Sequence, residues 1–267
     1  MNAVILKIGG SILAKLPDSF YEMVVQLKKS GICEPVIVHG GGPDINQALE
    51  KFEVESTFID GLRVTTDEVL DIAEMVMSGS VNKKIVHQLE KAGGAACGVS
   101  GLDCSLLKAA PVDPTGALGY VGQVAEVNSD WLNLLVKTGI IPVISPIGMD
   151  ASGQRYNING DMAASAVAGS LKGKLVLISD IPGVMESLDN TKIIHPVLTK
   201  QQVEEKISTG VIHGGMIPKV RSALKGLDGG ATESVILNGL DPIDLKNYIE
   251  GKKAGTKVVM EKEAYHV

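Results

Sequence analysis

Short runs of β-branched and other apolar residues alternate along this chain with segments of helical periodicity. The strand-like runs lie at 3–8, 35–39, 141–145, 174–178 and 234–237. The helix-like segments lie at 18–30, 43–51, 67–91, 129–138, 161–171 and 218–228. Continuous apolar runs are typical of strands buried on both faces of a parallel sheet. The alternation therefore predicts an α/β fold, a three-layer αβα sandwich around a central, mainly parallel sheet.

The predicted helix 67–91 has a clear start signal. Thr65 to Glu68 matches a capping box, in which Thr65 is the N-cap and the Glu68 side chain returns to its amide. The segment is long enough for a subunit contact as well as for core packing, and the sequence leaves both open. A different pattern, rich in Pro and Gly, fills 103–127 and predicts hairpins at the edge of the sheet.

A boundary between two lobes is expected near 170–174, where Gly169 to Lys174 separates a helix of small residues from a new strand. We expect an N-terminal lobe over 1–172 and a C-terminal lobe over 173–267. The C-terminal lobe then has strands of its own at 174–178, 234–237 and 256–259.

Charge and cysteine content exclude several classes of protein. The formal net charge is −6 and no basic cluster is present, which argues against nucleic acid and anionic membranes as partners. The apolar runs are only strand-sized and the first begins almost at Met1, so no spanning helix, signal or transit peptide is expected. Cys33, Cys97 and Cys104 lack metal-ligand spacing and fit buried or idle thiols in a reducing compartment. We expect a cytoplasmic protein.

Glycine-rich turns follow the first two expected strands. Gly9 and Gly10 follow the first strand, and Gly40 to Gly42 follow the second and precede Pro43. Glycine lets bare backbone N–H groups approach an anion, and Pro43 suits the first turn of a helix, whose N-terminus binds phosphate or carboxylate. Two such turns predict an enzyme that handles more than one anionic group.

Two lysines occupy positions where a cation needs a nearby anion. Lys7 lies inside an apolar strand, where an unpaired charge is costly. Lys219 follows Pro218 in the expected first turn of a helix, where the helix dipole disfavours a cation. Each has a simpler explanation, because Lys7 on an edge strand would reach solvent and Lys219 would be an ordinary surface lysine. The glycines beside Lys7 favour a phosphate partner.

Three further positions have the chemistry of a binding site. Asp161, at the start of a helix, is either an N-cap or the counter-charge that the two lysines require. The turn Ser179 to Val184 follows a strand, and ligands bind at the carboxyl ends of parallel strands, although an ordinary turn is the alternative. Arg63 suits a substrate carboxylate held in two places, or is a surface arginine on a hairpin.

Several common sites are not indicated. His39 and His195 have no partner spacing typical of a catalytic triad or a metal, and we assign neither a catalytic role. The chain has no GxxxxGK[ST] motif and no GxGxxG at its first turn, which argues against a P-loop enzyme and a Rossmann oxidoreductase.

Together these segments resemble the amino acid kinase family along nearly the whole chain. The matching motifs are Lys-Ile-Gly-Gly-Ser at 7–11, His-Gly-Gly-Gly-Pro at 39–43, Gly-Leu-Arg-Val-Thr at 61–65, Asn-Ile-Asn-Gly-Asp at 157–161, Ser-Asp-Ile-Pro-Gly-Val at 179–184 and Gly-Gly-Met-Ile-Pro-Lys at 214–219. The second and third look like the branch whose acceptor is N-acetyl-L-glutamate. The resemblance implies transfer of the γ-phosphoryl group of ATP to the γ-carboxylate of that acceptor, in arginine biosynthesis.

The resemblance also implies roles for the lobes and for single residues. The lobe 1–172 is expected to bind the acyl amino acid and to form a homodimer contact, and the lobe 173–267 to bind ATP. Catalytic roles are implied for Lys7, Lys219 and Asp161, with Asp161 orienting both lysines. Acceptor contacts are implied for Gly41, Gly42, Arg63 and Asn157. Nucleotide contacts are implied for Gly9, Gly10, Asp180, Ile181, Pro182, Gly183, Val184, Met185, Val211, Ile212 and His213.

No acidic cluster offers a protein cage for a metal, so Mg²⁺ is expected as MgATP, carried mainly by the phosphates and water. The chain departs from the family pattern at His213, where a smaller residue is usual, and at Gly160, where alanine is usual. It also lacks the N-terminal helical extension of arginine-inhibited hexameric relatives. By resemblance, a homodimer without arginine feedback is expected.

Two other functions stay open at this point. One is a kinase of the same family with a different acyl amino acid as acceptor, such as a carrier-linked aminoadipate. The other is a non-catalytic sensor of amino acid and nucleotide on the same fold. The presence of Lys7, Asp161 and Lys219 together argues against the sensor, which needs no transition-state charges.

Overall fold

The fold is built on one large mixed sheet. The computed structural model describes residues 2–188 and 191–260. Within these ranges, eight strands form the main sheet in the order β14-β16-β15-β11-β1-β2-β8-β5. Every neighbouring pair is parallel except β15 with β16. The bounds are β1 Ala3–Ile8, β2 Glu34–His39, β5 Ala96–Ser100, β8 Ile141–Ser145, β11 Lys174–Ser179, β14 Val197–Thr199, β15 Glu233–Asn238 and β16 Thr256–Val259.

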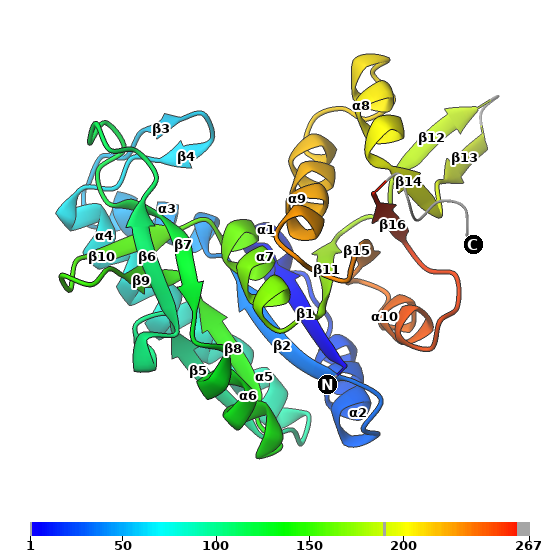
Figure 1. Cartoon of the computed structure of the whole chain (residues 1–267), viewed down its shortest axis with the longest axis horizontal. Helices are drawn as coiled ribbons and strands as arrows, with labels where there is room; N and C mark the ends of the chain where they lie inside the picture. The colour runs from blue at the N-terminus through cyan, green and yellow to red at the C-terminus, as the bar shows by residue number, and fades with distance from the viewer. Residues whose placement is uncertain (1, 189–190, 261–267) are drawn as a thin grey trace.

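Helices cover both faces of this sheet, which confirms the predicted α/β sandwich. One buried cluster joins the sheet to α2 (Asp18–Lys29), α5 (Asn82–Lys91) and α10 (Pro242–Ile249). A second cluster, on the other face, joins it to α6 (Ser129–Lys137), α7 (Gly160–Ser170) and α9 (Met216–Asp228). Further helices are α1 Gly10–Leu13, α3 Gly42–Lys51 and α8 Lys200–Ser208 (Figure 1), and Asp103–Ser105 form a short 3₁₀ turn.

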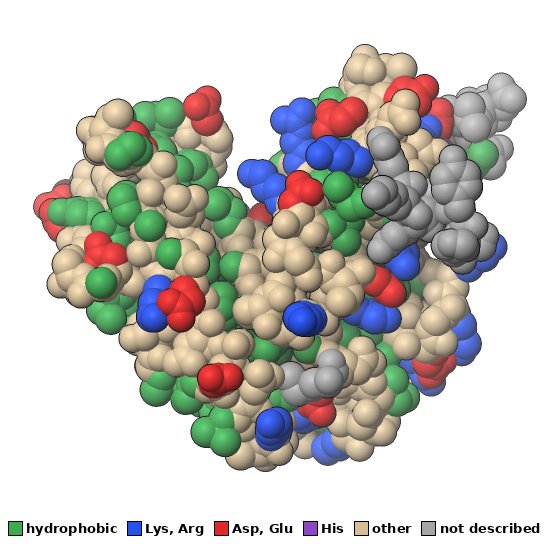
Figure 2. All heavy atoms as spheres, in the orientation of Figure 1, with side chains coloured by type: hydrophobic (Ala, Val, Ile, Leu, Met, Phe, Trp, Pro, Cys, Tyr) green, Lys and Arg blue, Asp and Glu red, His purple; other side chains and the backbone are tan. Residues whose placement is uncertain are grey.

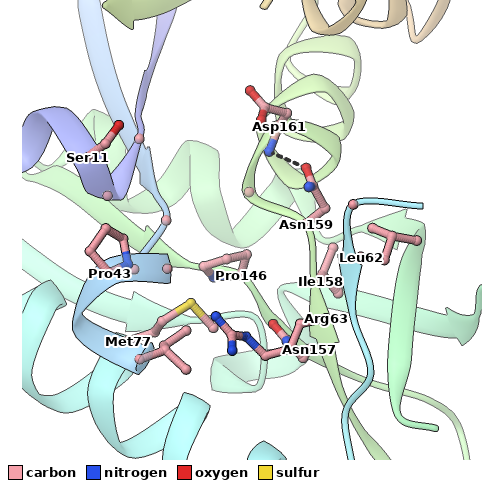
Figure 3. Close-up of a pocket in the computed structure, with 18 of the residues that line it drawn as sticks. Ser11, Pro43, Leu62, Arg63, Met77, Pro146, Asn157, Ile158, Asn159 and Asp161 are labelled. Carbon is pink, nitrogen blue, oxygen red and sulfur yellow. Dashed lines mark hydrogen bonds between the residues drawn. The ribbon is translucent and has the colours of Figure 1, made fainter. Parts of the chain in front are cut away.

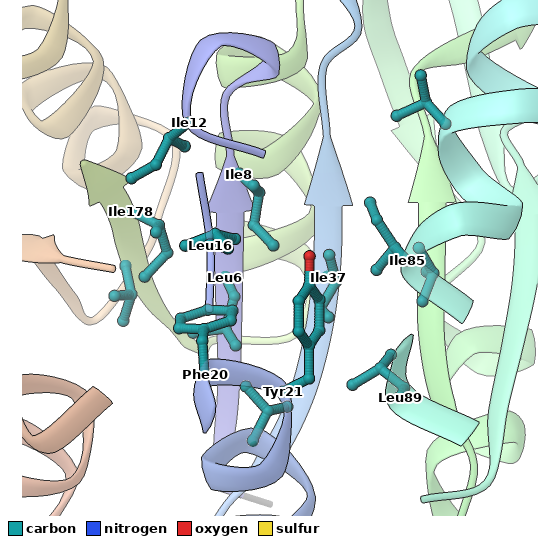
Figure 4. Close-up of a cluster of buried hydrophobic side chains, with 14 of the residues drawn as sticks. Leu6, Ile8, Ile12, Leu16, Phe20, Tyr21, Ile37, Ile85, Leu89 and Ile178 are labelled. Atoms are coloured by element: carbon teal, nitrogen blue, oxygen red, sulfur yellow. The ribbon is translucent and has the colours of Figure 1, made fainter. Parts of the chain in front are cut away.

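Core packing decides on which face of the sheet Lys7 lies. Leu6 and Ile8 of β1 belong to the cluster shared with α2 and α5, part of which Figure 4 shows. Ala3 and Ile5 belong to the cluster shared with α7. Because side chains alternate along a strand, Lys7 lies on the α7 face. β1 pairs with β2 and β11, so the alternative that Lys7 lies on an edge strand is wrong.

The irregular segment 103–127 forms a hairpin, as predicted, but not at the edge of the main sheet. Its strands β6 (Leu107–Pro111) and β7 (Val121–Val127) are antiparallel. Two short strands that the sequence did not indicate, β9 (Ile147–Met149) and β10 (Arg155–Ile158), close them into a small barrel. The hairpin therefore belongs to a second sheet, because β9 and β10 supply the neighbours that pair with it.

The predicted helix 67–91 contains an interruption and begins differently than expected. It consists of α4 (Asp67–Glu74), a π-helical segment η1 (Met75–Val81) and α5. Thr66, not Thr65, is the N-cap, and its hydroxyl accepts a hydrogen bond from the amide of Val69. The predicted capping box is wrong because the backbone of Thr65 is already held by Leu118 and Tyr120.

The main sheet runs through both of the expected lobes. Leu6 of β1 pairs with Ile37 on one side and with Val176 on the other, so the sheet continues across the expected boundary near 170–174. Figure 2 shows the molecule hollowed between the lobes, with Lys and Arg side chains on one rim. Among the described helices, none has the length and apolar character needed to cross a bilayer. Two hairpins complete the fold, β3 Phe58–Ile59 with β4 Leu62–Arg63 and β12 Met185–Leu188 with β13 Thr191–Ile194.

Candidate active site

The two glycine turns pack directly against each other at the carboxyl ends of β1 and β2. The Gly40 amide donates to the carbonyl of Ile8 at 2.9 Å. A Cβ added at Gly10 would lie 2.7 Å from Cδ of Pro43 and 3.0 Å from the backbone nitrogen of Gly42. Only glycine at position 10 lets the turns approach this closely. The amides of residues 41 and 42 have no hydrogen-bond acceptor among the described residues.

The start of α7 faces the same turns and holds Asp161. Asn159 is the N-cap, because its Oδ1 accepts from the amides of Asp161 at 2.9 Å and Met162 at 3.3 Å. The interpretation of Asp161 as a cap is therefore wrong, and its carboxylate is available elsewhere. Asp161 Oδ1 lies 3.0 Å from Lys7 Nζ, and the Lys7 side chain is only 16% exposed. The Asp161 carboxylate therefore neutralises the ammonium group of Lys7, which would otherwise be an unpaired charge inside a strand.

A cavity of about 370 Å³ lies between the glycine turns, the β3–β4 hairpin and the small barrel. Lys7, Asp161, Arg63 and Asn157 all line it, together with glycines from both turns. Figure 3 shows Arg63 and Asn157 on one side of this cavity and Asp161 on the other. The apolar lining comes from Pro43, Ile45, Phe58, Leu62, Met77, Val121, Pro146 and Ile158. The cavity therefore combines charged and apolar walls, as binding sites for small molecules commonly do.

Arg63 is positioned by neutral groups. Its guanidinium donates to Ser56 Oγ at 2.8 Å and to Asn46 Oδ1 at 2.5 Å, and lies 4.6 Å from the centre of the Phe58 ring. No carboxylate in the described part of the chain forms an ion pair with it. Burial lowers the pKa of Arg63 from its ordinary value. The guanidinium is thus preorganised with its charge unneutralised, which favours an anionic ligand.

Asn157 and the Arg63 backbone are connected through one hydroxyl. Asn157 Nδ2 donates to Thr65 Oγ1 at 3.2 Å, and that hydroxyl donates to the carbonyl of Arg63 at 2.8 Å. Thr65 is buried and forms a backbone bridge with Gly119. Its hydroxyl therefore fixes the positions of Arg63 and Asn157, the two side chains predicted to contact the acceptor substrate, relative to each other. The sequence did not assign Thr65 this position.

A smaller cavity of about 90 Å³ adjoins the first one on the side of the C-terminal lobe. Lys7, Gly9, Ser11 and Asp161 line both cavities. Ser179, Asp180 and Lys219 line only the smaller one. Lys7 and Asp161 consequently stand at the junction of the two spaces.

Lys219 lies in the first turn of α9, as predicted, but its partners differ from the expected one. Its Nζ donates to Ser179 Oγ at 2.6 Å and lies 3.4 Å from Asp180 Oδ1. Asp161 pairs with Lys7 and not with Lys219 in this conformation. Burial acts to raise the pKa of Asp180, but its own backbone amide and the charge of Lys219 lower it overall. Lys15 also lies 3.5 Å from the Asp180 carboxylate.

The other predicted nucleotide segments lie on the same side as this smaller cavity. Val184 and Ile212 are both 1% exposed and belong to the buried cluster on the α7 and α9 face of the sheet. These two side chains are inside the core and leave only their backbone for a ligand. Gly183 has φ of 146°, a conformation that favours glycine. Ile181, Pro182, Met185 and Val211 are half-buried and His213 is exposed.

Sequence reasoning missed several residues that line the cavities. Met77 comes from the π-helical segment, and its Cγ would lie 2.9 Å from a Cβ at Gly41. No local pattern distinguishes Met77 from the neighbouring apolar residues. Ser11 and Ser179 also line the smaller cavity, and they belong to the motifs 7–11 and 179–184. Their positions at or just after the end of a strand could have identified them as site residues. At Gly160, an added Cβ would lie 3.4 Å from the His39 carbonyl.

Comparison with known proteins agrees with this geometry. The model of the amino acid kinase family matches residues 2–238. A protein of Oceanobacillus iheyensis named acetylglutamate kinase is 57% identical over 267 residues, covering 100% of both chains. Another of that name from Halalkalibacterium halodurans is 44% identical, over 99% of this chain and 98% of the relative.

Solved structures give the same result for the fold. A Streptococcus mutans protein superposes with a TM-score of 0.79 at 30% identity, over 96% of this chain and 98% of the other. Carbamate kinase from Giardia lamblia bound to AMP-PNP has a TM-score of 0.70 at 15% identity, over 97% and 99%, and shows the fold alone. The family model spans most of this sequence and two full-length relatives exceed 40% identity. This chain therefore belongs to the amino acid kinase family.

Proposed function

We propose that this protein is an acetylglutamate kinase, which transfers the γ-phosphoryl group of ATP to the γ-carboxylate of N-acetyl-L-glutamate. The observation that carries the proposal is the pair of adjoining cavities with Lys7 and Asp161 at their junction. A transfer between two anionic substrates needs two neighbouring sites and a cation between them. The name shared by the full-length relatives supports this choice of acceptor.

The larger cavity suits the acceptor. Arg63 would hold the α-carboxylate, because its guanidinium is fixed by neutral partners and has two-pronged geometry for a carboxylate. Asn157 would orient the acetylamino group. The free amides of Gly41 and Gly42, at the start of α3, would receive the γ-carboxylate. The remaining apolar wall would contact the methylene chain and the acetyl methyl group.

ATP would approach from the C-terminal lobe. The turn Gly9–Gly10 and Lys219 would contact the phosphates, because they lie at and beside the smaller cavity. The segments Asp180 to Met185 and Val211 to His213 would receive the nucleoside. Asp180, which lines the smaller cavity, and the side chain of Lys219, which follows Val211 to His213 in the sequence and lines the same cavity, support this placement.

The reaction needs charge neutralisation more than proton transfer. The acceptor carboxylate is already ionised at pH 7, so no general base is required. Lys7 and Lys219 would offset the negative charge of the phosphoryl group as it moves between the two anions. Asp161 would hold Lys7 in place, as the 3.0 Å pair supports. Lys219 would leave Ser179 and Asp180 for the γ-phosphate when ATP binds.

Mg²⁺ would enter as part of MgATP. The two carboxylates that line the smaller cavity have lysine partners apart from Lys219, since Asp161 pairs with Lys7 and Asp180 lies 3.5 Å from Lys15. The phosphates and water would therefore be the main ligands of the ion. The bound ion would supply further neutralisation of the β- and γ-phosphates. We also propose a cytoplasmic homodimer. Phe52 and Met75 are exposed and line one groove between α3 and η1. They support a subunit contact at the helix 67–91, which contains η1.

A coupled ADP-release assay tests the proposed function. The purified chain would be given MgATP with N-acetyl-L-glutamate, glutamate, aspartate, UMP or carbamate in parallel. We expect N-acetyl-L-glutamate to give the highest kcat/KM, with an acyl phosphate product trapped by hydroxylamine. A higher kcat/KM with another acceptor would replace the proposed substrate, and no turnover with any acceptor would favour a sensor.

A further inference from the structure

His39 makes two hydrogen bonds directly behind the second glycine turn. It is the last residue of β2 and is fully buried. Its Nδ1 lies 2.9 Å from the carbonyl oxygen of Gly40, and its Nε2 lies 3.2 Å from Asn82 Nδ2. A carbonyl oxygen can only accept, so Nδ1 carries the hydrogen and Nε2 accepts from Asn82. Burial lowers the pKa of His39 to about 4, in agreement with a neutral ring.

Asn82 fixes this tautomer because its own orientation is determined on both sides. Nδ2 donates to the carbonyl of Val143 at 2.8 Å, and Oδ1 accepts from Lys83 Nζ at 3.2 Å. The Asn82 side chain is buried and occupies space that a Cβ at Gly98 would enter, only 1.8 Å from Oδ1. The amide therefore presents its NH₂ group, and not its oxygen, to the imidazole.

The π-helical segment sets the direction of Asn82. Asn82 is the first residue after η1, and regular helical residues are about 100° apart around the axis. One extra residue in a π turn changes the direction of every later side chain by that angle. Without η1, the Asn82 amide would not face His39 in the present register of α4.

We propose that His39 is a positioning residue that aims the amide of Gly41 at the acceptor. The peptide between Gly40 and Gly41 is planar and trans, so its C=O and N–H point in opposite directions. The His39 hydrogen bond pulls the C=O toward the sheet and thereby turns the N–H of Gly41 toward the larger cavity. Gly41 lines that cavity, and its amide has no hydrogen-bond acceptor among the described residues. The inference rests on the proposed function, in which this amide contacts the γ-carboxylate.

A pair of substitutions separates positioning from simple packing. His39→Asn places an amide NH₂ where Nδ1 was and keeps a donor for Gly40, whereas His39→Gln reaches Asn82 and loses that donor. We expect kcat of His39→Gln to fall on the order of 10²-fold, with KM for ATP within about threefold of wild type. His39→Asn should retain kcat within about tenfold. Thermal unfolding measures the stability that each variant loses. The two losses should be similar, because each substitution leaves one buried hydrogen-bond partner of His39 unpaired.

Equal losses of kcat in the two variants would overturn the proposal, since a packing defect does not depend on which nitrogen is replaced. A second measurement needs no variant and no turnover. Long-range ¹H–¹⁵N spectra of the wild-type chain, which has five histidines, identify the His39 tautomer once His39→Asn assigns its signals. The Nδ1–H tautomer supports the proposal and the Nε2–H tautomer overturns it. Absence of wild-type activity with N-acetyl-L-glutamate would instead count against the proposed function.

Discussion

Replacement of Lys219 tests the charge-neutralisation mechanism most directly. An ammonium about 4 Å from a unit negative charge interacts by roughly 4 kcal/mol at an effective dielectric near 20. That energy corresponds to about three decades in rate. The Lys219 side chain is 34% exposed, so solvent screening reduces the effect. We expect Lys219→Ala to lower kcat by about 10²- to 10³-fold, with a smaller change in KM for N-acetyl-L-glutamate.

Lys15 provides a matched control for this experiment. It also lies within 3.5 Å of Asp180, but its side chain is 59% exposed and it lines neither cavity of the site. Lys15→Ala should leave kcat within about threefold of wild type, since exposed pairs contribute little. Steady-state kinetics with both substrates varied would measure the two variants side by side. A Lys219→Ala enzyme with kcat within threefold of wild type would refute the role of this lysine.

Three further outcomes follow from the site and its surroundings. Arg63→Ala should raise KM for N-acetyl-L-glutamate about 10- to 100-fold, the effect of losing a hydrogen bond to a charged group, and change kcat little; an unchanged KM would show that Arg63 does not bind this acceptor. Gly10→Ala should lower the melting temperature and kcat, because its Cβ would meet Pro43 at 2.7 Å, whereas Gly42→Ala, with nothing within 4 Å, should melt like wild type. His39 has a lower pKa folded than unfolded, so protonation favours unfolding and stability is lost as pH falls from about 6.5 toward about 4. Between pH 8 and pH 5, urea unfolding should show wild type losing about 2 kcal/mol more than His39→Asn, and parallel curves would contradict this assignment.

The main sheet and the central pair of charges were predictable from the sequence for different reasons. Five strands of the sheet, β1, β2, β8, β11 and β15, are runs rich in Val, Ile and Leu, a pattern typical of burial on both faces. The edge strands β5 and β14 were not predicted, because β5 is Ala-Cys-Gly-Val-Ser and β14 has only three residues. Lys7 was identifiable because a charge inside such a run needs compensation. Its partner Asp161 lies far along the chain, so only the fold, or the motif shared with a family, could bring the two together.

Other features depend on contacts that no local pattern encodes. The strands β9 and β10 have only three and four residues. They are defined by their pairing with each other and with β6 and β7, which are distant in the sequence. The capping signal at Thr65 and Thr66 was ambiguous by one residue, and a distant backbone bridge to Gly119 decided between them. The helical periodicity of 67–91 did not indicate the π-helical segment or, with it, the position of Met77.

The continuous sheet has a consequence for how the site opens. β1 carries Lys7 and is hydrogen-bonded along its length to β2, on the side proposed for the acceptor, and to β11, on the side proposed for ATP. If the two sides of the site move closer together, the hydrogen-bonded strands must therefore twist, because no flexible linker separates the two sides. Such a deformation has a restoring force that grows with amplitude, so the resting distance between the lobes behaves as an elastic property of the strands. Hydrogen exchange at the amides of β1 and β11 should accordingly stay slow whether the site is empty or full.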